Sequence, residues 1–133
     1  MLQTIFISTG KAALDLNGLR STLNNAAMKN RYAGITGLIV FDGVRFLECL
    51  EGEADVVDAA FNRIVQNPLH RGCVLLSRKE SPLRQFENWS WACRGLQPEA
   101  FGPGLPTLVD NLVRNVSDLN TQALFSSFAR IRT

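Results

Sequence analysis

The chain has 133 residues, of which 46% are hydrophobic and 20% charged, the composition of one ordinary globular domain rather than of a disordered chain. Fourteen basic and twelve acidic residues leave a net charge of +2. A charge this small argues against a protein whose main task is to hold a nucleic-acid backbone.

Cysteine use and hydropathy give a first expectation about the compartment. Cys49, Cys73 and Cys93 are far apart and form no CxxC pair, so we expect reduced thiols and no zinc site. No apolar run approaches the length of a membrane span, and the N-terminus lacks the basic and apolar regions of a signal peptide. We therefore expect a cytoplasmic protein without a membrane partner.

Hydrophobic periodicity predicts the elements of the first half of the chain. An Ile-Phe-Ile triplet centres a first strand, leucines and alanines then recur at helical spacing, and Asp42-Gly43 is a hairpin turn signal between two apolar runs. In chain order, we expect a strand over 2–8, a helix from 16 to about 28, a strand over 35–41 and a strand over 44–51.

The second half predicts one more helix, at least one more strand and a helical tail. Val57, Ala60, Phe61 and Ile64 share one helix face, which stops near Asn67-Pro68. The remaining expectations are a strand over 73–77, a short strand around 91–96, a hinge-like break at 102–106, and tail helices over 108–116 and 119–131.

This order, β-α-β-β-α-β and then a helical tail, is the ferredoxin-like α+β arrangement, which places two helices on one face of the sheet. The opposite face would be bare, so we expect the tail or a second copy of the chain to cover it. The sequence thus predicts a main unit over residues 1–97 and a C-terminal helical extension over 98–133 that packs on the sheet or mediates oligomerisation.

Glu48 is the unusual residue of the second hairpin strand. Alternation places it between Phe46 and Leu50 on one face, where a carboxylate must find a partner, reach water or take up a proton. A structural ion pair is one interpretation, and a ligand pocket that requires a hydrogen bond is the other. Asn30 sits at the end of the first helix, where it could be a helix cap or a second polar group of such a pocket.

These residues belong to a longer pattern. Asn30, the run Ile35-Thr36-Gly37-Leu38, Phe46 and the run Leu50-Glu51-Gly52 together resemble the core motif of BLUF domains, the flavin-based blue-light sensors. Further matches follow at Arg63-Ile64, Pro68, His70 and Arg84-x-Phe86-x-x-Trp89-Ser90. The resemblance covers residues 1 to about 95.

The resemblance implies a cofactor and the residues that would hold it. In that family FAD stands between the two helices, with the edge of its ring near the sheet. Asn30 would then hydrogen-bond the polar edge of the flavin, and Arg63 would reach a ring carbonyl. Lys29 and His70 match neighbouring positions of the site, and Asn67 stands where an Asp is usual.

Departures from the family pattern affect the photochemistry. BLUF domains use a Tyr on the first strand as electron and proton donor and a Gln on the third strand as proton relay, whereas this chain has Phe6 and Glu48 there. Phe has no ionisable proton, and only a protonated Glu offers a hydrogen-bond donor. Trp91 stands where Met is common, and either Trp89 or Trp91 is an alternative electron donor. We expect the usual photocycle to be absent or changed.

Three other functions compete with a flavin-binding sensor. A flavin-free descendant could serve as an interaction or oligomerisation module. An RNA-recognition module shares the element order, but residues 43–50 lack the aromatic- and glycine-rich signature, so we expect no nucleic acid as partner. An enzyme is least supported, because Thr9-Gly10-Lys11 is a weak phosphate loop and one His limits acid–base chemistry. For the flavin-binding and the flavin-free alternatives alike, we expect self-association, and any response would pass through an unidentified downstream protein or the helical tail.

Overall fold

The computed structural model describes residues 1–12, 14–96 and 104–131. In chain order these residues form β1 (Leu2–Gly10), α1 (Leu16–Ala33), β2 (Thr36–Phe41), β3 (Arg45–Gly52), α2 (Ala54–Gln66), β4 (His70–Glu80), β5 (Trp89–Cys93), α3 (Gly104–Leu112) and α4 (Leu119–Arg130).

The strands form one mixed sheet in the order β4-β1-β3-β2-β5. Neighbouring strands run antiparallel, except that β5 pairs in parallel with β2. The parallel edge arises because the connection from β4 crosses the sheet before it returns beside β2. The ferredoxin-like α+β fold predicted from the element order is thereby confirmed.

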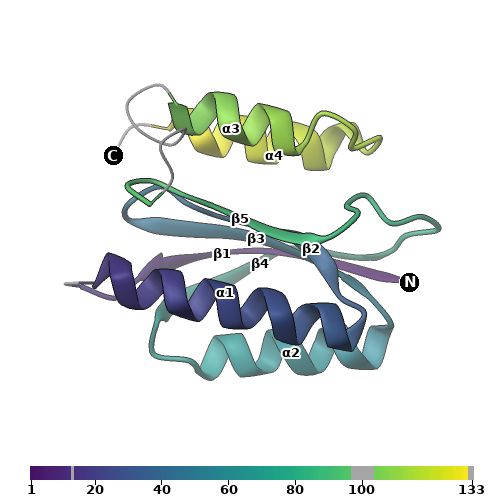
Figure 1. Ribbon diagram of the computed structural model, residues 1–133. Coiled ribbons are helices and arrows are strands. Elements are labelled where there is room, and N and C mark those ends of the chain that lie inside the picture. The colour runs from purple at the N-terminus through teal and green to yellow at the C-terminus, as the bar shows by residue number, and fades with distance from the viewer. Residues whose placement is uncertain (13, 97–103, 132–133) are drawn as a thin grey trace.

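Three layers make up the molecule, with α1 and α2 on one face of the sheet and α3 and α4 on the other (Figure 1). Strand alternation divides the core accordingly. Phe6, Ile39, Phe46 and Leu50 pack with the α1 and α2 layer, and Ile5, Leu38, Leu47 and Cys49 pack with the α3 and α4 layer.

The C-terminal helices cover the sheet face that the sequence left open. Val109 of α3 and Val113, the residue after the end of α3, are buried against this face. Phe125 and Phe128 of α4 are buried there too. The helices of the same chain therefore shield this apolar sheet face from water. The bare face that motivated the expectation of self-association is absent from the described structure, although the oligomeric state itself stays a prediction.

Several element boundaries differ from the sequence prediction. Helix α1 continues to Ala33 and ends at Gly34, which has φ 73° and carries the left-handed cap. Strand β4 is longer than residues 73–77, and β5 begins earlier than expected, at Trp89. Part of the expected hinge at 102–106 is helical, because Gly104 opens α3 and Pro106 lies in its first turn, where proline is tolerated. Residues 102 and 103 lie outside the described residues.

Within the described ranges, no helix combines the length and the apolar character that crossing a membrane requires.

Candidate functional site

A cavity of about 160 Å³ lies between α1, α2 and the sheet. Its walls are largely apolar, and its polar groups come from both helices and from three strands, so that it joins segments far apart in the sequence. The lining residues are Thr22, Leu23, Ala26, Lys29, Asn30, Ile39, Glu48, Ala60, Arg63, Ile64, Leu69, His70 and Trp89. We call this space the inter-helix cavity.

Glu48 enters the inter-helix cavity from β3. Its register neighbours on the adjacent strands are Phe6 of β1 and Ile39 of β2. Only 2% of Glu48 is exposed. Burial raises the pKa of its carboxyl to about 8, and the Trp89 indole N–H, which donates to Oε2 at 3.2 Å, lowers this pKa in part. At neutral pH the carboxyl is therefore mostly protonated, and it can both donate and accept a hydrogen bond.

Asn30 and Lys29 reach the cavity from the last turns of α1. The expectation that Asn30 caps this helix is wrong, because the helix continues past it and Gly34 forms the cap. Gly takes the left-handed conformation there without a Cβ penalty. The extra helical turn keeps the Asn30 side chain on the wall of the cavity.

Arg63 lines the cavity from α2, and His70 closes it from the start of β4. The His70 side chain is buried, with its Nδ1 2.8 Å from the Ser8 hydroxyl and its ring against Phe46. Burial lowers the pKa of His70 to about 4, so the imidazole is neutral at pH 7. Arg63 and Lys29 are therefore the cationic groups among the described lining residues.

Three of the singled-out residues lie elsewhere. Phe6 is completely buried and packs edge-on against Phe61 at 4.9 Å between ring centroids. Asn67 is the C-cap residue of α2, and its Oδ1 accepts from the Leu69 amide at 2.9 Å. Trp91 donates through its indole to Asn24 on α1 at 3.3 Å. None of the three lines the inter-helix cavity.

Sequence reasoning missed a polar clamp at one edge of the sheet. The fully buried Glu51 carboxylate accepts from the amides of Gln85 and Phe86 and from the Thr36 hydroxyl. The Gln85 side chain in turn accepts from the amides of Ser117 and Asp118, which precede α4. The motif string contained Glu51 and Arg84, but only tertiary structure shows that Glu51 holds the connection from β4 to β5.

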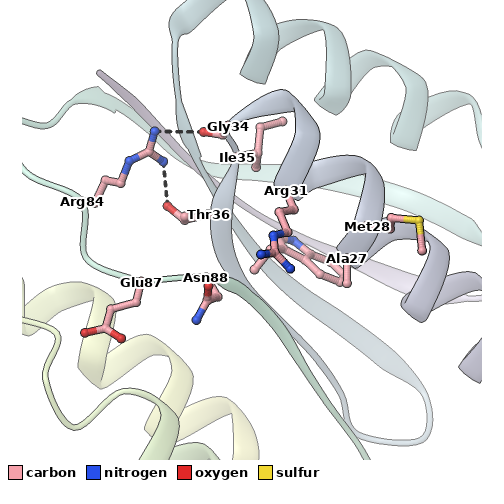
Figure 2. Close-up of a pocket in the computed structure, with 10 residues that line it drawn as sticks. Ala27, Met28, Arg31, Gly34, Ile35, Thr36, Arg84, Glu87 and Asn88 are labelled. Atoms are coloured by element: carbon pink, nitrogen blue, oxygen red, sulfur yellow. Dashed lines mark hydrogen bonds between the residues drawn. The ribbon is translucent and has the colours of Figure 1, made fainter.

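A second hollow, of about 460 Å³, lies between the C-terminal half of α1 and the connection from β4 to β5 (Figure 2). Figure 2 shows the Arg84 guanidinium turned toward Gly34 and Thr36, and it donates to the Gly34 carbonyl at 2.9 Å and to the Thr36 hydroxyl at 2.9 Å. A third bond reaches the Glu51 carbonyl at 3.2 Å. Arg84 therefore belongs to the clamp that joins β2, β3 and the connection to β5.

The polar groups of the inter-helix cavity fit the edge of a flavin ring. An amide at Asn30, a guanidinium at Arg63 and a neutral carboxyl at Glu48 supply both donors and acceptors, while Leu23, Ile39 and Ile64 supply apolar walls. The volume of about 160 Å³ is below the range of about 300–1,000 Å³ typical of ligand pockets. A bound flavin therefore requires the side chains on α1 and α2 to move apart.

The sheet order and the cavity together define a ferredoxin-like α+β domain with a ligand cavity between its paired helices and the sheet. A family model described as sensors of blue-light using FAD matches residues 1–92. The chain therefore belongs to the BLUF family, whose domains are sensory modules, and the resemblance seen in the sequence is confirmed.

Curated relatives share this segment at low identity. The chain is 22% identical over 94 residues to the photoactivated adenylate cyclase subunit beta of Euglena gracilis, covering 71% of this chain and 11% of that protein. It is 33% identical over 61 residues to the blue light- and temperature-regulated antirepressor BluF of Escherichia coli K12, covering 46% of this chain and 15% of that protein. The match thus spans only a small part of each curated relative.

Solved structures agree with the fold over nearly the whole chain. A Klebsiella pneumoniae BlrP1 complex with calcium and cyclic diGMP superposes with a TM-score of 0.80 at 25% identity, covering 97% of this chain and 34% of that one. The dark state of the BLUF protein BlrB superposes with a TM-score of 0.69 at 22% identity, covering 95% and 96%. The second likeness concerns the fold alone.

Proposed function

We propose that this chain is a blue-light sensory module that binds FAD in the inter-helix cavity and has an absent or altered photocycle. The observation that carries the proposal is the convergence of Asn30, Arg63 and Glu48 on one cavity from three different elements. The family match supports the cofactor class. A solved structure of BlrP1 described with FMN and cyclic diGMP, at 26% identity and a TM-score of 0.78, covers 97% of this chain and 33% of that one.

Each polar residue has a chemical task in this proposal. Asn30 and the neutral Glu48 carboxyl hydrogen-bond the polar edge of the ring, and the Arg63 guanidinium donates to a ring carbonyl. Lys29 and His70 complete the polar rim, and Asn67 supports it from the end of α2. The apolar walls exclude water and so strengthen these bonds.

The altered photochemistry follows from two positions. Phe6 has no hydroxyl and lies against Phe61 outside the cavity lining, so it offers neither a proton nor a hydrogen bond. A flavin held in this cavity would supply the light absorption and an electron-accepting ring. Trp89, buried beside Glu48, is the aromatic donor that lines the same cavity, and Trp91 lies further out.

The C-terminal helices are the proposed route to other molecules. We divide the chain into a flavin-binding unit over residues 1–97 and an extension over 98–133. In this proposal a response of the unit passes to an unidentified protein partner in the cytoplasm, and self-association is a further expectation. No enzymatic step is assigned to these residues.

Absorption spectroscopy tests cofactor binding directly. The purified chain, incubated with FAD and then desalted, should retain a stoichiometric flavin spectrum. The double variant Asn30→Ala with Arg63→Ala should lose the flavin spectrum. The control variant Arg31→Ala, which lies beside Asn30 on α1 but outside the cavity lining, should retain the flavin spectrum. A wild-type protein that stays colourless with FAD, FMN and riboflavin overturns the proposal.

Restoring the two family residues tests the photochemistry. The flavin-loaded double variant Phe6→Tyr with Glu48→Gln should gain a light-induced red shift of flavin absorption that the wild type lacks. Each single variant is the matched control, because one supplies only the donor and the other only the amide. A red shift already present in the wild type contradicts the assignment of Phe6 and Glu48 as inactivating residues.

A flavin-free interaction module is the second candidate. The small volume of the inter-helix cavity and the edge-on packing of Phe6 against Phe61 favour it. Protein purified from its native cells with stoichiometric flavin would exclude this alternative.

A further inference from the structure

A basic pocket of about 550 Å³ lies at the end of the sheet where β2 turns into β3, the left end in Figure 1. Its volume is within the usual range for small-molecule sites. The lining side chains divide into an apolar wall and a cationic rim. The wall is Leu14, Leu16, Phe41 and Val44, and the rim is Lys11, Arg71 and Arg94.

Lys11 and Arg71 have no acidic neighbour among the described residues that line the basic pocket. Three cationic side chains line it, and none of the described lining residues is acidic. The nearby Asp42 carboxylate is committed to the hairpin, since its Oδ1 accepts from the amides of Val44 and Arg45 and its Oδ2 lies 3.7 Å from the Arg45 guanidinium. A pocket with excess positive charge favours an anionic ligand.

A backbone carbonyl orients one guanidinium group of this pocket. Arg71 donates through Nη2 to the Gly10 carbonyl at 3.3 Å. This bond restricts the Arg71 side chain, and a neutral carbonyl leaves its positive charge in place. Such preorganisation reduces the entropy lost when a ligand binds.

The hollow in Figure 2 is lined by two arginines, Arg31 and Arg84, but it differs from the basic pocket because an acidic residue shares its lining. The Arg84 donors there are spent on Gly34, Thr36 and Glu51, and the acidic Glu87 is part of the lining. This comparison favours the basic pocket as an anion site.

We propose that the basic pocket binds the phosphate group of a small organic phosphate whose apolar body rests against Phe41, Leu14 and Val44. A guanidinium fork matches phosphate oxygens in pairs, and the Lys11 ammonium adds a point charge. The apolar wall favours a phosphate ester over inorganic phosphate, because it removes apolar surface of the ligand from water.

The position of the pocket allows two sources for the phosphate. The Lys11 amide donates to the Leu69 carbonyl at 3.1 Å, and Arg71 follows His70, so the basic pocket adjoins the segment that closes the inter-helix cavity. The phosphate is therefore either the tail of a bound flavin nucleotide or part of a separate small molecule. In both cases the cationic rim would recognise the phosphate group in the same way.

Calorimetry with adenosine monophosphate as probe tests the proposal on the full chain without flavin. Adenosine monophosphate should bind at least about tenfold more tightly than adenosine, because only the former engages the cations. The double variant Lys11→Gln with Arg71→Gln should lose at least about tenfold in affinity. The variant Arg31→Gln with Arg114→Gln, which removes the same charge elsewhere, should stay within about twofold.

Equal binding of the two probes, or an equal loss in the control variant, overturns the proposal. Unchanged thermal unfolding of the Lys11 and Arg71 variant excludes misfolding as the cause of its weaker binding. Arg71→Lys is a further check, since it keeps the charge and should retain more affinity than Arg71→Gln.

Riboflavin distinguishes the two sources and separates this proposal from the proposed function. Riboflavin carries no phosphate, so its affinity should be unaffected by the Lys11 and Arg71 variant. Competition of adenosine monophosphate with FAD but not with riboflavin identifies the flavin tail as the ligand. Simultaneous binding with FAD identifies a separate phosphate ester, and either result supports the basic pocket.

Discussion

Two buried titratable residues, Glu48 and His70, make the stability of this domain depend on pH in opposite directions. The pKa of Glu48 is raised to about 8 in the fold, so the unfolded state loses this proton first as pH rises, and stability falls from about pH 4.5 to about pH 8. The pKa of His70 is lowered to about 4, so stability falls as pH drops from about 6.5 toward 4.

The two slopes oppose each other between about pH 4.5 and 6.5, and above that range only the Glu48 slope remains. We expect the free energy of unfolding to be nearly level in the first range and to decline by up to about 1.4 kcal/mol per pH unit from pH 6.5 to 8. Urea unfolding at several pH values measures this. Glu48→Gln should remove the decline, and a decline that persists in that variant contradicts the assignment.

Trp89 and Trp91 differ in their position relative to the cavity, and this difference makes a residue-scale prediction. Trp89 lines the cavity and Trp91 is bonded to Asn24 outside its lining. In flavin-loaded protein, Trp89→Phe should raise flavin fluorescence several-fold, while the matched Trp91→Phe should change it much less. The expected rise follows because electron transfer from a nearby tryptophan quenches flavin fluorescence. An equal rise in fluorescence in both variants would show that Trp89 is not the principal quencher.

At the scale of elements, two glycines show how the same substitution has different costs. A Cβ at Gly37, where φ is 151°, would lie 1.9 Å from the Cys49 carbonyl oxygen on the neighbouring strand. A Cβ at Gly34, where φ is 73°, would meet nothing within 4 Å. Gly37 therefore permits close approach of two strands, whereas Gly34 only permits a left-handed helix cap.

Gly34→Ala should lower the free energy of unfolding by about 1 kcal/mol, the conformational cost of a left-handed residue. Gly37→Ala should cost more than about 3 kcal/mol or prevent folding, because the β2 and β3 backbones would have to separate. Chemical denaturation of both variants makes the comparison, and similar losses would refute the close approach at Gly37.

At the scale of the whole molecule, the C-terminal helices bury one apolar face of the sheet and so form a second core within the chain. Ile5, Leu38 and Leu47 of the sheet are buried on the face that α3 and α4 cover. Lys79, which bonds to Asp118 at 2.6 Å, and Gln85, which caps the segment before α4, fix the helices at one edge. The tail therefore covers a sheet face that would otherwise be open to a second copy of the chain.

Removal of residues 104–133 should increase the self-association of the chain, because it uncovers a contiguous apolar sheet face. Size-exclusion chromatography with light scattering measures this change. Phe125→Asp is a milder control, since Phe125 is fully buried and a carboxylate there should loosen the tail without removing it. A monomeric truncated chain would contradict the role given to the tail.

Periodicity in the sequence alone predicted the element order, and that order indicated the ferredoxin-like arrangement with two helices on one sheet face. Alternation also placed Glu48 between Phe46 and Leu50 on the helix face, as the structure has it. These are local or pairwise properties of the chain, which is why they can be read without coordinates.

Tertiary structure alone decided the rest. The end of α1 at Gly34 put Asn30 on the cavity wall instead of at a cap, and the Glu51 clamp and the basic pocket each combine residues from several segments. The pKa values of Glu48 and His70 depend on burial by neighbours distant in sequence. Desolvation and close packing arise only when the layers assemble, so no local pattern could encode them.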